Sequence, residues 1–206
     1  VGLLLSRIAL PYSEIASFDD LPTPFRCVAV DLGTGSAVTM GDGSLATAML
    51  ATMAIPGVFT PVARDGRLLV DGGVLHNLPT EAGRQMGADI VGAVDLSRGF
   101  ADTRPQESLL GILGRTVGVT IYANERRSLA LADIVIAPDL SGLTAADFDR
   151  VDTFYERGFA AATEQTAALM RLSLPEPEWE AYVAERNRRK RAGTTTPTFV
   201  RAPTLS

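Results

Sequence analysis

The sequence contains very few of the residues that usually bind metals or form disulfides. It has one cysteine, Cys27, and one histidine, His76, among 206 residues. A single cysteine excludes an intrachain disulfide framework and a multi-cysteine metal site, and a single histidine excludes a histidine-rich one. Because Cys27 lies in an apolar run, we expect a buried and unreactive thiol. We therefore expect no metal site.

Long apolar runs and a strong net charge are also missing. No window is long and apolar enough to span a bilayer, and the first ten residues lack the basic start and cleavage site of a signal peptide. The formal net charge of −5 argues against a polyanionic partner, so we expect no nucleic acid. A basic run at 186–191 is expected to be a solvated helix end; contact with a membrane surface or nucleic acid is the alternative.

The fractions of hydrophobic and charged residues are those of an ordinary globular protein. Hydrophobic residues make up 46% of the chain and charged residues 21%, which is enough apolar material for one core. We expect 1–174 to form one domain and 175–206 to form a helix and a linker that leads into a further domain. Because the chain opens in apolar sequence without an initiator methionine, we expect it to be a piece of something longer.

The order of the predicted elements indicates an α/β fold. Short apolar runs predict buried strands at 25–32, 67–70, 89–96 and 133–137, and 37–40 completes a hairpin with the first. Helices are predicted at 45–53, 80–86, 107–132, 151–172 and 179–191. Strand, helix and strand over 67–96 predict a βαβ unit with parallel neighbours. We expect a three-layer α/β/α arrangement with a mostly parallel sheet.

The helix predicted at 151–172 has an amphipathic pattern that indicates one buried side. The residues expected on that side are Phe154, Tyr155, Phe159, Ala162 and Leu169.

One stretch, 55–79, concentrates the features of a catalytic site. Asp71 follows a short apolar strand and precedes a turn formed by Gly72 and Gly73, and Asn77 begins the next element. The glycines leave room for another backbone or a ligand to approach closely. An acid at the carboxyl end of an apolar strand is typical of the chemistry of open α/β sheets. Asp71 is interpreted either as a general base or as a turn aspartate that bonds its own backbone.

Other polar residues have structural interpretations beside catalytic ones. His76 suggests a triad with a serine, or a loop histidine at the rim of the site. Ser36 and Ser44 follow glycines but match no G-x-S-x-G nucleophile elbow, so we interpret them as turn and cap residues. Asp31 and Asp95 also end apolar strands, where an aspartate caps the following turn.

Several segments together resemble the patatin-like phospholipase family. AIPGVF, followed by D-G-G and N-x-P at this spacing, is far more specific than D-G-G alone. The segments that carry the resemblance are 45–61, 69–74 with Asn77 and Pro79, 87–95 and 132–150.

The resemblance implies a lipid acyl hydrolase with a Ser-Asp dyad and no catalytic histidine. Asp71 corresponds to the family's D-G-[GA] aspartate, which takes the proton of the serine hydroxyl. Phospholipid or another acyl lipid is the implied substrate, and the chemistry needs no metal or organic cofactor. The apolar site is expected to be lined by Met53, at the end of the predicted helix, and by Ile55, Val58 and Phe59 after it. The alternative is that these four residues belong to the core.

The chain departs from the family pattern because it contains neither the glycine-rich oxyanion loop nor the G-x-S-x-G serine. We expect the C-terminal part of a patatin domain that forms oligomers or binds a segment supplying the nucleophile. An inactive fragment or lipid-binding subunit is one alternative, and a Ser-His-Asp hydrolase within this chain is another. The segment from Trp179 to Pro203 resembles the junction in a bacterial subgroup fused to a surface-antigen barrel, which implies a secreted, periplasmic or outer-membrane location; without it, the location is cytoplasmic.

Overall fold

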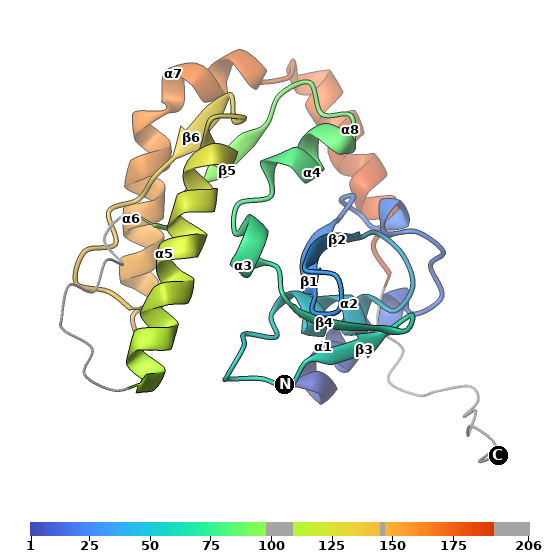
Figure 1. The fold of residues 1–206 in the computed structure, drawn as a ribbon. Coiled ribbons are helices and arrows are strands. Elements are labelled where there is room, and N and C mark those ends of the chain that lie inside the picture. The colour runs from blue at the N-terminus through green and yellow to red at the C-terminus, as the bar shows by residue number, and fades with distance from the viewer. Residues whose placement is uncertain (98–108, 145–146, 192–206) are drawn as a thin grey trace.

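The computed structural model describes residues 1–97, 109–144 and 147–191 (Figure 1). Two groups of elements are joined by short helices in the middle of the chain. One group holds the first four strands, and the other holds a two-stranded sheet with the long helices. The α/β class predicted from the sequence is confirmed.

A four-stranded sheet in the order β2-β1-β4-β3 forms the first group. Its strands are β1 (Cys27–Asp31), β2 (Ser36–Met40), β3 (Val62–Arg64) and β4 (Arg67–Asp71). All three pairings are antiparallel. Tight turns join β1 to β2 and β3 to β4, and a chain that reverses through a turn must pair antiparallel. The predicted hairpin of β1 and β2 is confirmed.

One helix covers this sheet and completes the core. α2 (Leu45–Thr52) begins at Ser44, whose hydroxyl accepts a hydrogen bond from the Thr47 backbone N–H, as predicted. α1 (Gly2–Ala9) and the short turns η1 (Leu10–Tyr12) and η2 (Phe18–Asp20) precede the sheet. The buried core cluster consists of Ile15, Phe18, Leu21, Cys27, Ala29, Met40, Ala48, Ala51 and Leu69.

The expected burial of Cys27 is confirmed. Its sulfur faces the Ala48 carbonyl oxygen at 3.6 Å, and burial raises the pKa of the thiol to about 11. At neutral pH the thiol is therefore protonated and a poor nucleophile.

The second group contains the parallel pair. β5 (Gly92–Val94) and β6 (Ile134–Ile136) pair in parallel, and α5 (Leu109–Leu129) lies between them in the chain. α6 (Val151–Glu164), α7 (Thr166–Leu169) and η3 (Met170–Leu172) follow β6. The expected mostly parallel sheet is therefore seen only in part, because the parallel pairing is confined to β5 and β6 in the described part of the chain.

The βαβ unit predicted over 67–96 is wrong. β4 and β5 belong to different sheets, because β4 is paired on both sides, by β1 and by β3, and has no free edge. The helical crossover instead joins β5 to β6 through α5. The predicted start of α5 at 107–108 lies outside the described residues.

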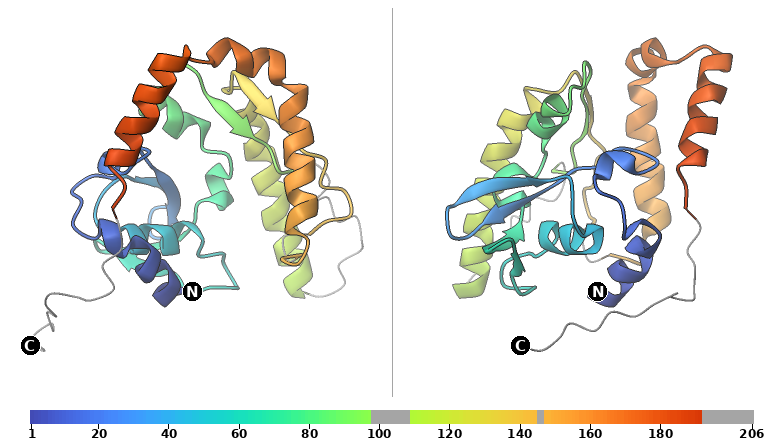
Figure 2. Two further views of the ribbon diagram at one scale, coloured as in Figure 1. Left: turned by 180° about the vertical axis from the view of Figure 1, so that it is seen from behind. Right: turned by 90° about the vertical axis from the view of Figure 1, so that its right-hand side faces the viewer.

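Short helices connect the two groups, and one later helix returns to the first. α3 (Gly73–His76) and α4 (Thr80–Gln85) lead from β4 to β5. α8 (Glu176–Arg188) runs back toward the N-terminal elements (Figure 2). There the Arg189 side chain donates to the Asp19 carbonyl oxygen at 3.3 Å, and the Arg191 N–H donates to the Tyr12 hydroxyl at 3.2 Å. The predicted linker beyond 191 lies outside the described residues.

The predicted buried side of α6 is only partly correct. Phe154 and Ala162 are half-buried, but Tyr155 is 69% exposed and Phe159 is 63% exposed. These two rings lie one helical turn apart and stack at 6.2 Å between centroids, on a face that the described residues leave open. Leu169 is also exposed, and it belongs to α7 rather than α6, which ends at Glu164. Among the described helices, none has the length and apolarity needed to cross a bilayer.

Candidate functional site

Asp71 is the last residue of β4 and is fixed by its backbone on two sides. It pairs with Ala29 of β1, and its N–H donates to the Ala54 carbonyl oxygen at 3.0 Å. The loop that follows α2 is thereby held beside the end of the strand. Asp71 itself is half-buried, so solvent or a ligand can reach its side chain.

Among the described residues, the carboxylate of Asp71 accepts one hydrogen bond, and the donor is local. Oδ1 accepts from the Gly73 backbone N–H at 2.7 Å, which is the bond expected of a turn aspartate. In the described part of the chain, no Arg or Lys forms an ion pair with Asp71 and no donor contacts Oδ2. The turn therefore orients the carboxylate and leaves one oxygen available.

The two glycines after Asp71 permit close contacts with different neighbours. A Cβ at Gly72 would lie 2.2 Å from the Val28 carbonyl oxygen of β1, so the expected close backbone approach is confirmed there. A Cβ at Gly73 would lie 3.0 Å from Asp71 Oδ1 and 3.1 Å from Asn77 Oδ1. The side chains of Asp71 and Asn77 therefore flank the same glycine.

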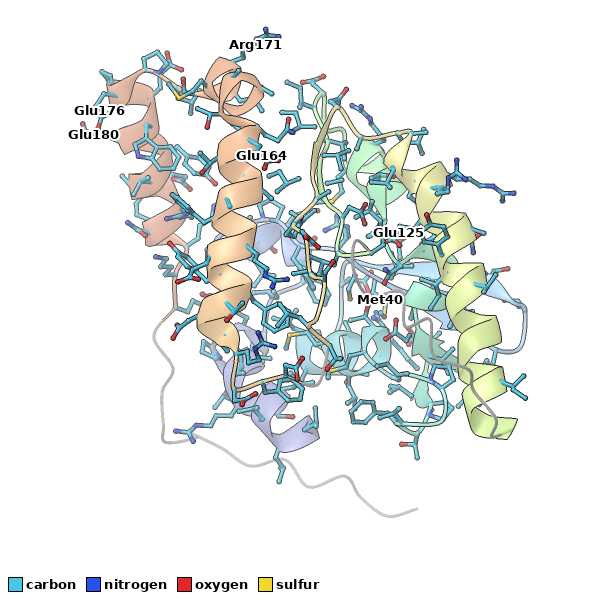
Figure 3. All side chains as sticks on the ribbon, turned by 90° about the vertical axis from the view of Figure 1, so that its left-hand side faces the viewer. Met40, Glu125, Glu164, Arg171, Glu176 and Glu180 are labelled. Carbon is cyan, nitrogen blue, oxygen red and sulfur yellow. The ribbon has the colours of Figure 1, made fainter. Side chains whose placement is uncertain are left out.

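Asn77 contacts a buried acid that sequence reasoning missed. Its Nδ2 donates to Glu125 Oε1 of α5 at 3.1 Å. Glu125 is only 4% exposed and points from α5 toward the interior (Figure 3). Burial raises the pKa of the Glu125 carboxyl; the Asn77 hydrogen bond opposes this change, and the nearby negative charge of Asp95 adds to it.

Asp31, Asp95 and Ser44 have the structural roles expected of them, and Ser36 does not. Asp31 accepts from the Gly33 N–H at 2.9 Å and the Thr34 hydroxyl at 3.1 Å, and Asp95 accepts from the Ser97 N–H at 2.9 Å. Ser44 caps α2. Ser36 is the first residue of β2 rather than a turn residue.

His76 ends α3 and is half-buried. Among the described residues no hydrogen bond joins it to a serine or an aspartate. The described part also brings no three His, Cys, Asp or Glu side chains together in a group able to hold a metal ion.

The four residues expected to line an apolar site are not core residues. Met53 and Phe59 are half-buried, Ile55 is exposed, and Val58 is 67% exposed. They lie on the loop that Ala54 ties to the backbone of Asp71. The structure therefore places accessible apolar side chains on the segment next to the candidate base.

The basic run lies at the end of α8 and is partly neutralised. Arg188 pairs with Glu185, and Arg189 pairs with the same carboxylate at 3.2 Å. The guanidinium of Arg186 lies over the Tyr182 ring, 5.9 Å from its centroid. These contacts fit the expected solvated helix end.

Comparison with known proteins matches this chain to patatin-like phospholipase and NTE family proteins. The family model described as patatin-like phospholipase matches residues 16–83, which include Asp71. An uncharacterized NTE family protein of Mycobacterium tuberculosis is 32% identical over 188 residues, covering 78% of this chain and 32% of that protein.

Two further relatives match shorter segments. A second uncharacterized NTE family protein of M. tuberculosis is 43% identical over 81 residues, covering 39% of this chain and 22% of the relative. The patatin-like phospholipase domain-containing protein 7 of Mus musculus is 36% identical over 80 residues, covering 38% of this chain and 6% of the relative. The chain thus spans a third or less of the length of these curated relatives.

Proposed function

Because the chain belongs to the patatin-like phospholipase family, we propose that Asp71 is the general base of a serine hydrolase that cleaves ester bonds of phospholipids or other acyl lipids. The observation that carries this proposal is the position of Asp71 within the matched segment. It stands at the end of β4 with Oδ1 held by the Gly73 N–H and Oδ2 free of hydrogen bonds among the described residues.

The proposed reaction uses the free carboxylate oxygen for proton transfer. Asp71 takes the proton of a serine hydroxyl while the serine oxygen bonds to the acyl carbonyl carbon. The proton then passes to the alcohol that leaves, and an acyl-enzyme remains. Asp71 next takes a proton from water, whose oxygen attacks the acyl group, and the serine is restored as the fatty acid leaves. No step needs His76 or a metal.

The loop beside Asp71 supports an apolar substrate. Met53, Ile55, Val58 and Phe59 place accessible side chains next to the Ala54–Asp71 backbone contact, where an acyl chain would gain by leaving water. Because phospholipids are held in bilayers, we also propose that this face meets a membrane surface. Gly72, Gly73 and Asn77 would shape the turn that presents the base.

The nucleophile is proposed to come from residues outside these 206. The chain has no G-x-S-x-G segment, and its relatives are much longer than the part that matches. The same absence favours a second candidate, a lipid-binding or structural subunit without activity of its own. The single turn hydrogen bond of Asp71 is compatible with that candidate as well.

A complementation assay tests the proposal. We expect the isolated chain to show no p-nitrophenyl ester hydrolysis, and to become active when a patatin segment carrying the glycine-rich loop and the G-x-S-x-G serine is joined to it. This joined form is called the complemented protein below. Activity of the isolated chain that is lost on Asp71→Asn would show that the nucleophile lies within it. A folded but inactive complemented protein would favour the lipid-binding candidate.

The chain exposes apolar surface that we propose is covered by a second copy when no complement is present. The exposed side chains lie on and around β5 and on one face of α6, and exposed apolar surface promotes association. They are Ile90, Val94, Leu96, Val151, Tyr155 and Phe159.

Light scattering tests this association. We expect a mass above the 21.8 kDa of one chain, with the excess rising with protein concentration. Replacing Tyr155 and Phe159 together by serine should shift the distribution toward the monomer, because it removes two stacked rings from the exposed face. A monodisperse monomer of the unmodified chain over the accessible concentration range would contradict the proposal.

A further inference from the structure

Glu125 is buried, and no described residue offers it a cationic partner, which is costly for an acid. It is 4% exposed, and among the described residues it accepts one hydrogen bond, from Asn77 Nδ2. In the described residues no arginine or lysine pairs with it. A leucine at this position of α5 would fill similar space without desolvating a carboxyl group. The acid therefore needs an explanation beyond packing.

Three neighbouring polar residues on one part of α5 bind the segment that follows Asp71. Asn124 Nδ2 donates to the Val74 carbonyl oxygen at 3.5 Å, and Glu125 accepts from Asn77. The Ser128 carbonyl oxygen accepts from the Thr80 hydroxyl at 2.8 Å. α3 is a single helical turn, too short to hold its orientation by its own backbone bonds. These contacts thus fix its direction against α5.

Asn77 connects Glu125 to the turn of the candidate base. Its Nδ2 faces Glu125, while its Oδ1 lies beside Gly73 on the side also occupied by Asp71 Oδ1. Gly73 donates the hydrogen bond that orients Asp71. A rotation of the Asn77 amide would move its Oδ1 away from Gly73. It would therefore change the surroundings of the hydrogen bond between the Gly73 N–H and Asp71 Oδ1.

We propose that Glu125 is a positioning residue that fixes the Asp71 carboxylate through the side chain of Asn77 and the Gly73 turn. This inference rests on the proposed function of Asp71. A base must be held at its working geometry because a displacement of about 1 Å can cost about 100-fold in rate. Glu125 contributes by keeping the Asn77 amide, and with it α3, in one orientation.

Steady-state kinetics of the complemented protein test the role. We expect Glu125→Leu to lower kcat by up to about 100-fold with little change in KM, because substrate contacts are elsewhere. Glu125→Gln keeps an oxygen that accepts from Asn77 Nδ2 and is expected to retain most of kcat. Asn77→Ala should reproduce the loss seen with Glu125→Leu, and it serves as the test if the leucine variant does not fold. Unchanged kcat in folded Glu125→Leu or Asn77→Ala would overturn the inference.

Thr80→Val is the matched control for general loosening of the contact with α5. It removes the Thr80–Ser128 hydrogen bond but leaves Asn77 and Glu125 in place. We expect it to lower stability without the loss in kcat. If Thr80→Val and Glu125→Leu reduce kcat equally at equal stability, Glu125 has only a structural role and the inference fails.

Nuclear magnetic resonance of the isolated chain gives a readout independent of activity. In Glu125→Leu we expect shifts of the Asn77 side-chain amide and the Gly73 backbone amide signals, and in Glu125→Gln only small shifts of both. An unchanged Gly73 amide signal in folded Glu125→Leu would refute the link from Glu125 through Asn77 to the Gly73 turn, whether or not Asp71 is the general base. If instead Gly73 moves but Asp71→Asn leaves hydrolysis intact, the contact stands and the proposed function fails.

Discussion

We expect the Asp71→Asn variant of the complemented protein to lose about 10²- to 10⁴-fold in hydrolysis rate, the range typical of removing a general base. The amide has the shape of the carboxylate, and its oxygen still accepts the Gly73 N–H that Asp71 Oδ1 accepts at 2.7 Å. The turn therefore stays intact while the group that takes the proton is lost. Initial rates with a p-nitrophenyl ester measure the effect, and thermal unfolding verifies that the fold is preserved.

Two variants separate this prediction from its alternatives. Asp31→Asn is the matched control, because Asp31 also ends a strand of the same sheet and also accepts a turn N–H, from Gly33. It should keep near-normal activity. His76→Ala should have a modest effect. Loss of activity in His76→Ala comparable to that in Asp71→Asn would contradict the dyad and support a Ser-His-Asp arrangement.

In the first sheet, the sequence predicted correctly the features that depend only on neighbouring residues. The apolar run before Gly33 and the short strand predicted at 37–40 indicated the β1–β2 hairpin, and Ser44 indicated the start of α2. The same logic applied to β3 and β4, but only the strand at 67–70 was predicted, and its hairpin with β3 was not. Asp65 and Gly66 form the two-residue turn between them with φ of 52° and 74°, which is the most typical turn of a tight hairpin.

Strand partners could not be predicted from order along the chain. A helix between two strands indicates a parallel crossover only when the first strand has a free edge. β4 has none, because the Asp65-Gly66 turn brings β3 to one side and β1 occupies the other. The crossover therefore begins at β5. The start of the crossover at β5 depends on which strands pair with β4. The pattern of apolar residues at 67–96 carries no information about that pairing.

The site residues that lie close together in the sequence could be predicted from their motif. The contact that joins distant parts of the sequence could not. Asp71, Gly72, Gly73 and Asn77 lie within seven positions of the sequence. The Asn77–Glu125 contact joins residues 48 positions apart, and an acid within a polar helical segment gives no sign of burial. Glu125 is removed from water by the packing of α5 in the folded chain, where α3 contacts it through Asn77.

We expect Gly72→Ala to destabilise the chain by roughly 3 kcal/mol, the upper part of the range for overpacking a close-packed interior. The backbone at Gly72 has φ −65° and ψ −23°, which any residue adopts, so backbone strain is not the cause. The cause is the Val28 carbonyl oxygen, 2.2 Å from where the methyl group would stand. Either the end of β4 moves away from β1, or Val28 moves and weakens the core strand.

Gly92→Ala in β5 is the matched control, because a Cβ there meets no described residue within 4 Å. Its effect on the free energy of unfolding should stay within about 0.5 kcal/mol, as for most surface changes. Urea unfolding of both variants measures the difference. Because Asp71 precedes Gly72 and pairs with Ala29 of the same strand β1, the displacement also moves the proposed base. Gly72→Ala in the complemented protein should therefore lose activity even at temperatures where it remains folded. Equal stability of the two variants would mean that β1 and β4 lie farther apart in solution, and the base would then lack the support from β1 that its proposed role requires.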